Sequence, residues 1–351
     1  MKGDFFISKL PEFDDHELVF FGANKKTGLR SFIAVHNTNL GPAVGGTRFR
    51  QYRSESEALR DALRLSRAMT YKCALAKVPY GGGKGVIVAD SGKLKKAELV
   101  RAYAEKVDIL KDRFFTGEDV GIDEDDIRVM LTATSSIIGR PGVGGDPSPW
   151  AAAGVYAAMQ AALKAMYGSP DIHGRTFAVK GLGKVGFELC RLIYREGGRL
   201  IGADTDTEAV KRAMYAYPRM KIVDAGEIYK RNIDVFSPCA LGGDLNLRTI
   251  PQLRCKIVCG GANNQLESPA DGGRLYRRGI LYIPDYLANA GGLINVVAEL
   301  DKRGYDRGRV ERKVKAIEGT ADEVIRLSKK KDKPTSEVAD RLAEDIYNHR
   351  E

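Results

Sequence analysis

The pattern of apolar and polar residues begins with short runs typical of strands. The apolar runs Leu18–Phe21 and Phe32–Val35 are separated by the polar stretch 24–28, which ends in a glycine. Two such runs joined by a turn predict a β-hairpin. The short apolar stretch Ala74–Val78 is predicted as another strand.

Helical periodicity appears next. Ser54 and Glu57 form a capping-box signature, and the apolar residues after them recur at helical spacing. This helix is expected to end at Lys72, next to the predicted strand. Further helices are expected over residues 95–110, 150–167, 187–196, 309–328 and 336–349, and another from Leu293.

The second half of the chain alternates strands with helices. Strands are predicted over residues 176–180, 200–203, 234–237, 257–259 and 281–283. Each run ends in a loop, as expected of parallel strands whose carboxyl ends face a ligand. The pattern predicts an α/β protein.

Residues 138–149 contain four glycines and three prolines, which suggests a boundary between two domains. We expect a substrate-binding and oligomerisation α/β domain over 1–140, completed by residues 330–351. A Rossmann-type dinucleotide-binding domain is expected over 141–329, with a cleft between the two.

Composition narrows the class of protein. The chain has 351 residues, 43% of them hydrophobic and 29% charged, which is typical of a globular protein. No apolar run is long enough to span a membrane, and no signal peptide is recognised. The five cysteines are interpreted as reduced, which favours a cytoplasmic protein. Cys255 and Cys259 are too isolated to predict a zinc site, and no metal is expected.

The net charge of +10 raises the question of nucleic-acid binding. The basic residues are scattered, however, and the densest run, 329–333, falls between two predicted helices. We therefore interpret that run as a solvated loop and expect neither nucleic-acid nor membrane partners.

The most specific motif is glycine-rich. The predicted strand 176–180 runs into Gly181-Leu182-Gly183-Lys184-Val185-Gly186, a helix follows, and the next strand ends at Asp204. Glycines at these positions allow a tight turn and a close approach of a pyrophosphate to the helix N-terminus. Asp204 would accept hydrogen bonds from the ribose and repel a 2′-phosphate, which favours NAD. Lys211 and Arg212 keep NADP as an alternative.

Two lysines flank a second glycine-rich stretch. Lys72 ends a predicted helix, and Lys84 follows the glycines 81–83. A second ammonium nearby would lower the pKa of Lys84 and suit it to act as a general base. Taken alone, the stretch is better explained as a surface turn that carries a solvated lysine.

A candidate carboxylate, Asp119, lies where a predicted strand gives way to a loop. It could be catalytic or a solvated loop acid. The acidic cluster 123–126 is better explained as a helix N-cap and first turn, where negative charge is favoured.

Motifs along nearly the whole chain carry a resemblance to a known family. They are Gly41–Arg48, Met69–Lys72, Gly81–Lys84, Glu118–Gly121, Gly181–Gly186, Ala262–Leu266 and Asn289–Gly292. In these the chain resembles the NAD-dependent amino-acid dehydrogenases of the leucine, phenylalanine and valine type, relatives of glutamate dehydrogenase. The resemblance implies reversible oxidative deamination of an L-amino acid to a 2-oxo acid and ammonia, by a homo-oligomer.

The resemblance also implies residue roles. Lys72 would bind the substrate carboxylate, Lys84 would be the general base and acid, and Asp119 would exchange protons with the amino group. Further substrate contacts are expected from Gly45, Gly46, Val44, Gly117, Asn263, Leu293 and Val296. Cofactor contacts are expected from Arg48, Ser148, Gly181, Leu182, Gly183, Lys184, Val185, Gly186, Asp204, Thr205, Cys239, Ala240, Gly261, Ala262, Asn263 and Asn289.

The expected side-chain pocket holds no charged residue, which argues against glutamate as substrate. Thr116-Gly117 with Leu293 resembles phenylalanine- and tryptophan-type members, and a missing methyl at Gly117 would make room for a ring. We expect phenylalanine ahead of leucine or valine. Ala151 stands where relatives place a threonine, which removes one expected contact to the nicotinamide amide. A biosynthetic aromatic relative and a silent NAD-binding protein remain as alternatives.

Overall fold

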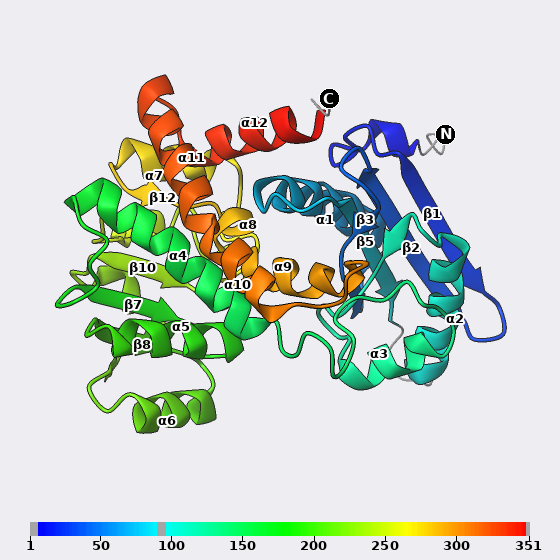
Figure 1. Cartoon of the computed structure of the whole chain (residues 1–351), viewed down its shortest axis with the longest axis horizontal. Helices are drawn as coiled ribbons and strands as arrows, with labels where there is room; N and C mark the ends of the chain where they lie inside the picture. The colour runs from blue at the N-terminus through cyan, green and yellow to red at the C-terminus, as the bar shows by residue number, and fades with distance from the viewer. Residues whose placement is uncertain (1–5, 90–95, 349–351) are drawn as a thin grey trace. The chain divides into compact units, whose positions relative to one another are not determined.

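The chain forms two compact units, seen in the computed structural model, which describes residues 6–89 and 96–348 (Figure 1). The first unit comprises residues 1–145, 296–305 and 343–351, and the second comprises 146–295 and 306–342. Both are α/β, as expected. The division at 145/146 lies within the glycine- and proline-rich stretch 138–149, a few residues after the expected bound at 140/141.

A six-stranded mixed sheet forms the framework of the first unit. Its strands are β1 (Leu18–Asn24), β2 (Leu29–Asn37), β3 (Ala43–Val44), β4 (Thr47–Arg50), β5 (Gly81–Val88) and β6 (Phe114–Phe115). The order is β1-β2-β5-β3-β6, and β4 also pairs with β5. The predicted hairpin is confirmed, because β1 and β2 pair antiparallel with Leu18 opposite Val35.

Helices complete the first unit. They are η1 (Ile7–Lys9), α1 (Glu55–Leu75), α2 (Lys96–Ile109), α3 (Glu124–Leu131) and η4 (Ala298–Leu300). Ser54 caps α1 by accepting a hydrogen bond from Glu57 N, and Asp123 caps α3 in a complete capping box. The cap interpretation of the acidic cluster is therefore confirmed. The expected helix start at residue 95 lies outside the described residues.

Two local predictions around the glycine-rich stretch were wrong. Residues 74–78 do not form a strand, because α1 continues through Leu75. The glycines from Gly81 do not form a turn but begin β5, which is buried along its whole length. A Cβ added at Gly82 would lie 2.5 Å from Ser66 O of α1. The glycines thus serve close helix-on-strand packing rather than a change of direction.

The sheet of the second unit is entirely parallel, with the order β12-β11-β10-β7-β8-β9. Its strands are β7 (Thr176–Lys180), β8 (Arg199–Ala203), β9 (Lys221–Ile222), β10 (Val235–Pro238), β11 (Ile257–Val258) and β12 (Leu281–Tyr282). In sequence order this is the 3-2-1-4-5-6 arrangement of dinucleotide-binding folds, in which the order of the strands reverses between β7 and β10. Ligands bind such sheets at the carboxyl ends of these two strands.

The helices of the second unit are α4 (Ser148–Tyr167), α5 (Lys184–Arg195), α6 (Thr207–Ala216), η2 (Ile228–Lys230), η3 (Ile250–Gln252), α7 (Ala270–Arg277), α8 (Asp285–Ala288), α10 (Arg307–Lys315) and α11 (Ile317–Lys331). Figure 1 shows α4 running alongside α11, and both helices pack together. The chain passes from one unit to the other within α9 (Gly291–Val297) and α12 (Thr335–Asn348).

The closing helices differ from the prediction in two ways. The single helix expected over 309–328 is divided at Ala316 into α10 and α11. Residues 330–342, expected with the first domain, belong to the second unit. Thr335 Oγ1 donates to Tyr282 O there, and Tyr286 Oη donates to Asp340, so polar contacts hold α12 to that unit. The expected end at residue 349 lies outside the described residues.

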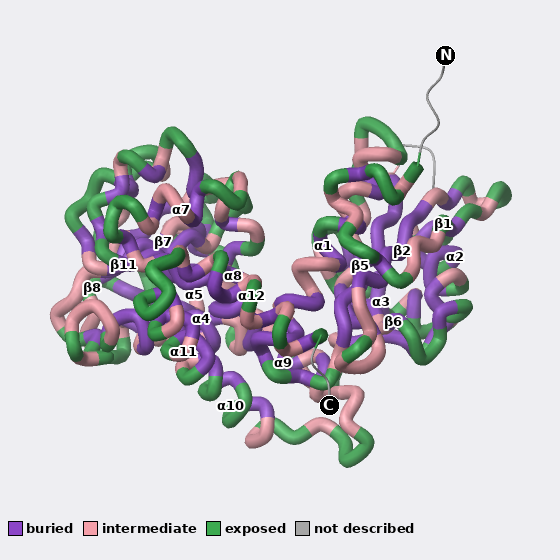
Figure 2. Tube along the Cα trace, turned by 90° about the horizontal axis from the view of Figure 1, so that it is seen from above, coloured by how far each residue is buried: buried purple, intermediate pink, exposed green. Residues whose placement is uncertain are grey.

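Each unit has its own apolar interior, which follows its strands in the burial map of Figure 2. In the first unit the largest fully buried side chains include Tyr103, Phe114 and Ile127, and in the second Phe177 and Phe236. Two separately buried sheets therefore give each unit a rigid framework for its own loops.

Candidate active site

Strand β5 positions Lys84 in the interior of the first unit. Lys84 pairs with Ala34 of β2 and is only 5% exposed. The glycines on either side of Lys84 leave no space in which a side chain could fit. A Cβ on Gly83 would lie 2.6 Å from the Phe114 ring, and one on Gly85 would overlap Tyr103 Oη. Lys84 therefore projects from a strand that is otherwise closely covered.

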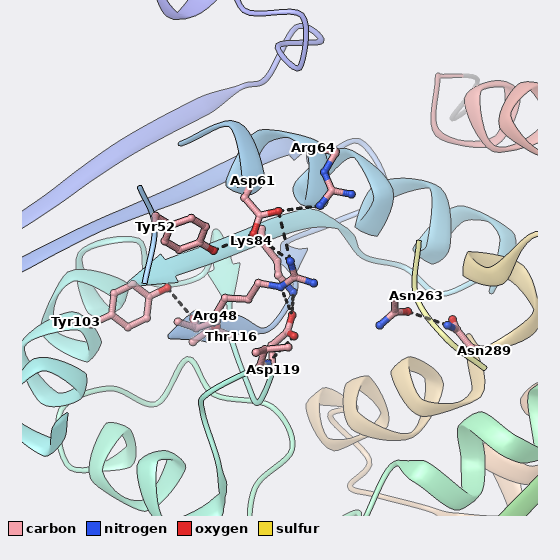
Figure 3. A network of polar contacts seen from close by, with 12 residues as sticks. Arg48, Tyr52, Asp61, Arg64, Lys84, Tyr103, Thr116, Asp119, Asn263 and Asn289 are labelled. Atoms are coloured by element: carbon pink, nitrogen blue, oxygen red, sulfur yellow. Dashed lines mark hydrogen bonds and ion pairs between the residues drawn. The ribbon is translucent and has the colours of Figure 1, made fainter. Parts of the chain in front are cut away.

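Asp119 is the partner of Lys84. Lys84 Nζ donates to Asp119 Oδ2, and Asp119 Oδ1 accepts a 2.6 Å hydrogen bond from Val120 N (Figure 3). Burial raises the pKa of Asp119, but the positive charges of Lys84 and Arg48 outweigh it and bring the pKa to about 2. Asp119 is thus ionised at neutral pH.

The paired glycines Gly45 and Gly46 allow this meeting. A Cβ on Gly45 would overlap Gly83 O of β5, and one on Gly46 would lie 3.0 Å from the Asp119 Cβ. The segment is held by backbone hydrogen bonds, Gly45 N to Phe115 O at 3.1 Å and Thr47 N to Gly117 O at 2.9 Å. Glycine is therefore required there to bring the Asp119 loop up to β5.

Arg48, an expected cofactor contact, is ion-paired in this structure. Its guanidinium is between two carboxylates of the first unit: Nη1 is 3.0 Å from Asp61 Oδ2, and Nε is 3.5 Å from Asp119 Oδ2. Figure 3 shows Arg48 between these two carboxylates, and we call this group of side chains the carboxylate network.

Lys72 is half-buried in the last turn of α1, and α1 packs against β5, which carries Lys84. The two lysines therefore belong to adjacent elements. Val44 is fully buried on β3. Leu293 and Val296 are three residues apart on α9, a spacing that puts them on one face of the helix.

The expected free space at Gly117 is absent. A Cβ added there would lie 2.6 Å from Ile138 O and 3.2 Å from Ile138 Cγ1. Ile138 N donates to Thr116 O at 2.8 Å, which holds this segment in place. Ile138 therefore occupies the space that a methyl at residue 117 would take. The absence of that methyl does not alone make room for a substrate ring. This corrects the sequence-based interpretation.

The glycine-rich motif of the second unit forms the expected turn between β7 and α5. Gly181 has a φ of +100°, and a Cβ there would lie 2.6 Å from Ala240 N. Gly183 is the N-cap of α5, makes no side-chain cap, and has nothing within 4 Å of its Cβ position. A Cβ on Gly186 would overlap Gly181 O. The open side at Gly183 and the uncapped helix N-terminus fit a pyrophosphate.

Asp204 follows β8 and lies against this turn. Its Oδ2 accepts a 2.6 Å hydrogen bond from Leu182 N, and its Oδ1 accepts one of 2.9 Å from Asp206 N. Thr205, next to it, is exposed. Arg212 donates to Leu182 O at 2.9 Å and stacks on Phe187. The carboxylate is thus fixed beside the turn, where an adenosine ribose would lie in this fold.

The loops after β10 and β11 meet beside the same turn. Gly261 N donates to Cys239 Sγ at 3.4 Å, and Val185 packs on Gly261. Ala262 N donates to Pro238 O at 3.0 Å. Asn289 Nδ2 donates to Asn263 Oδ1 at 2.8 Å and to Gly261 O at 3.1 Å. The structure therefore brings the two asparagines together, as amides that could hold another amide.

The remaining expected cofactor contacts lie at the start of α4 and α5. Ser148 begins α4, and its N–H donates to Asp146 Oδ1 at 2.8 Å. Lys184 is largely exposed, with Nζ 3.7 Å from Asp146 Oδ2. Ala151 is half-buried one residue after Trp150.

Sequence reasoning missed the residues behind the site. Asp61 and Tyr52 complete the carboxylate network of the first unit: Tyr52 Oη donates to Asp61 Oδ2 at 2.9 Å. Lys180 of β7 donates to Tyr229 and Asp244 in the second unit. The only sequence signal for the carboxylate network was the spacing of Asp61 and Arg64, an acid and an arginine three positions apart. Such pairs are common on exposed helices.

Comparison with known proteins gives consistent matches. The model of the Glu/Leu/Phe/Val dehydrogenase dimerisation domain matches residues 18–136, and that of Glutamate/Leucine/Phenylalanine/Valine dehydrogenase matches residues 204–344. A leucine dehydrogenase of Geobacillus stearothermophilus is 44% identical over 97% of this chain and 92% of its own. A phenylalanine dehydrogenase of Caldalkalibacillus thermarum is 43% identical over 97% and 93%.

A solved structure agrees with these matches. The crystal structure of L-tryptophan dehydrogenase from Nostoc punctiforme superimposes with a TM-score of 0.84 and 41% identity, covering 95% of this chain and 96% of that one. Relatives named for three different amino acids are thus almost equally similar. Within residues 6–89 and 96–348, no helix is long and apolar enough to cross a membrane.

Proposed function

Because the chain belongs to the Glu/Leu/Phe/Val dehydrogenase family and is an amino-acid dehydrogenase, we propose that it catalyses the reversible NAD-dependent oxidative deamination of a hydrophobic L-amino acid. The products are the 2-oxo acid and ammonia. The observation that carries the proposal is the buried ion pair of Lys84 with Asp119 on a glycine-lined strand. An amine and a carboxylate in contact can pass protons to and from a substrate amino group.

Each catalytic residue has its own role in the proposed reaction. The Lys72 ammonium binds the substrate carboxylate. Lys84 takes a proton from the water that attacks the substrate imine and returns it later. Asp119, a carboxylate at neutral pH, accepts a proton from the amino group and gives one to the departing ammonia. Bound NAD would supply the acceptor for the hydride that leaves the substrate Cα.

The residues of the second unit fit a dinucleotide. The bare Gly183 face and the uncapped N-terminus of α5 suit the pyrophosphate, and Asn263 with Asn289 suits the nicotinamide amide. Asp204 has lone pairs left for ribose hydroxyls beyond its two backbone hydrogen bonds. Its negative charge would repel the extra phosphate of NADP, and Arg212 already binds Leu182 O. These features support NAD as the cofactor.

With NAD as cofactor, kcat/KM is expected to exceed that with NADP by about 10²-fold, since an unpaired phosphate beside a carboxylate costs several kcal/mol. Asp204→Ser should lower this ratio at least tenfold. Asp206→Asn, two residues away, removes an exposed carboxylate but keeps a residue that can cap α6, so it should leave the ratio unchanged. Equal use of both cofactors by the parental enzyme would contradict the assignment.

The proposed substrate is hydrophobic because the expected pocket residues are uncharged. Val44 and Leu293 are buried aliphatic side chains, and Gly117 packs on Ile138. A γ-carboxylate among them would be desolvated without a cationic partner. We rank phenylalanine ahead of leucine, valine and tryptophan, because Thr116-Gly117 and Leu293 resemble the phenylalanine type.

This ranking predicts the order of activities on a panel of free amino acids, followed as NADH formation at 340 nm. Phenylalanine is expected to be used best, the other three within about 10²-fold, because a methylene in a pocket is worth only ~1–3 kcal/mol. Glutamate should give no detectable turnover. A clear preference for leucine or valine would reverse the ranking, and efficient use of glutamate would overturn the pocket assignment. No turnover with any amino acid would favour a silent NAD-binding protein.

We also propose that the enzyme is a homo-oligomer, because the matched model of residues 18–136 describes a dimerisation domain. A cytoplasmic location is proposed from the five free cysteines, four of them buried.

A further inference from the structure

Asp61 lies behind the candidate site and has no part in the chemistry proposed above. Its carboxylate, on α1, is 11% exposed and accepts hydrogen bonds from three side chains: Tyr52 Oη at 2.9 Å, Arg48 Nη1 at 3.0 Å and Arg64 Nη2 at 2.8 Å. Burial raises the pKa of Asp61, but the Arg48 charge and these hydrogen bonds outweigh it and lower the pKa overall. Burial raises the pKa of Tyr52, which therefore remains a donor. Asp61 is thus a fixed, ionised carboxylate.

Arg48 connects Asp61 to Asp119. The guanidinium is 13% exposed, so its charge is poorly screened by water. Nη1 hydrogen-bonds to Asp61, whereas Nε is buried, lies 3.5 Å from Asp119 Oδ2, and makes no hydrogen bond among the described residues. Arg48 thus acts on Asp119 through its charge, while Lys84 Nζ holds the hydrogen bond to the same oxygen.

This arrangement depends on Asp61. Arginine forms strong two-pronged pairs with carboxylates, and Asp119 is the other carboxylate within reach of Arg48 among the described residues. Without an anion at residue 61, the guanidinium would lose its hydrogen-bonded partner and be drawn toward Asp119, in competition with Lys84. The balance of charge would change as well. The two positive charges of Lys84 and Arg48 offset the two negative charges of Asp119 and Asp61. Removal of Arg48 leaves an excess negative charge beside Lys84 and Asp119, and removal of Asp61 leaves an excess positive one.

Other charged groups face Asp61 from the surrounding elements. A cavity of about 190 Å³ beside it is also lined by Glu12, Arg50, Glu57 and Arg60. Tyr52 and Arg64 face Asp61 directly, and Lys84 and Arg48 face Asp119. Arg64 is half exposed, so its charge is largely screened. Arg48 is therefore the group through which Asp61 acts on Asp119.

We propose that Asp61 is a positioning residue for the deamination: it holds Arg48 at a distance from which the guanidinium charge acts on Asp119 without displacing Lys84 from that carboxylate. This inference rests on the proposed function. It predicts that Asp61 and Arg48 shift the pH dependence of turnover in opposite directions, which a purely structural role of Asp61 would not do.

The test compares pH profiles of kcat/KM for the amino acid used best, with purified full-length parental enzyme, Asp61→Asn, Arg48→Met and Asp61→Asn/Arg48→Met. Asp61→Asn adds net positive charge and should move the profile about one unit to lower pH, with at least a tenfold loss of kcat/KM at the optimum. Arg48→Met should move it about one unit to higher pH. The double variant should return to within about 0.3 unit of the parental profile.

The matched control is Arg60→Ala, which removes an arginine that lines the same cavity but pairs with Glu12 and not with Asp61. Its profile should coincide with that of the parental enzyme, and its kcat/KM should stay within about twofold. If Asp61→Asn does not fold, as judged by its thermal melt, Tyr52→Phe removes one hydrogen bond from Asp61 and should give a shift of the same sign and smaller size. NADH affinity, measured by fluorescence titration, should be unchanged in all variants.

The outcomes separate the two ideas. If none of the amino acids tested supports NAD reduction by the parental enzyme, both the proposed function and this inference are refuted. An active parental enzyme whose Asp61→Asn and Arg48→Met profiles shift in the same direction, or not at all, refutes this inference alone. A raised NADH dissociation constant in Arg48→Met with an unshifted profile would make Arg48 a cofactor ligand instead.

Discussion

Lys84→Ala is expected to bind NADH with parental affinity and to lose about 10³-fold or more in kcat/KM for amino-acid deamination. The variant removes the only proton carrier on β5, and positioned acid–base groups contribute typically 10²–10⁴-fold to a rate. Asp119 would remain paired with Arg48, so no buried carboxylate is left alone. The glycine turn that fits the cofactor belongs to the other unit, so NADH affinity should be unaffected.

The measurement is steady-state NADH formation together with a fluorescence titration of NADH. Lys26→Ala, an exposed lysine in the turn between β1 and β2, is the matched control and should behave as the parental enzyme. A thermal melt of Lys84→Ala establishes that the variant is folded. Near-parental turnover in a folded Lys84→Ala would show that Lys84 is not the acid–base group.

Gly82→Ala should destabilise the first unit by at least about 3 kcal/mol, at the upper end of overpacking effects, and abolish activity with it. The added methyl would overlap Thr70 N and Thr70 Oγ1 and lie 2.5 Å from Ser66 O. Two of these are backbone atoms of α1, which cannot rotate away. Relief requires α1 and β5 to separate, and these elements carry Lys72 and Lys84.

Urea unfolding followed by circular dichroism would detect this change as a lowered midpoint or as a separate early transition of the first unit. Gly319→Ala is the control, because that glycine is in α11 with nothing within 4 Å of its Cβ position. It should stabilise the second unit by about 0.5–1 kcal/mol, the usual gain in a helix. An unchanged midpoint in Gly82→Ala would show that α1 can shift at little cost.

Patterns of local sequence predicted the elements whose signals are local. The hairpin and the dinucleotide turn follow from apolar runs bounded by turn residues, and the cap at Asp123 follows from side chain to backbone hydrogen bonding over three residues. The α/β class and the parallel sheet of the second unit follow from the alternation of strands and helices. These features depend on neighbours in the chain.

The parts that were not predicted depend on contacts distant in sequence. Glycine was interpreted as a breaker at Gly81, yet it continues a strand there because α1 lies against it. The ion pairs of Arg48 were not predicted, because its partners Asp61 and Asp119 lie thirteen and 71 positions away in the chain. The free space expected at Gly117 is filled by Ile138, whose position no periodicity reveals.

The packing of β5 also limits how this enzyme can evolve. Added methyls at Gly81, Gly82, Gly83 and Gly85 would each meet other parts of the unit. Any change in the first or second base of a glycine codon introduces a side chain or a stop codon. This strand should therefore appear in a saturation mutagenesis library as a block of lethal positions. If Val44 and Leu293 line the substrate pocket as proposed, new substrate preferences are more accessible through them, because their aliphatic side chains can change size. Libraries designed to alter specificity should vary those positions and leave the strand intact.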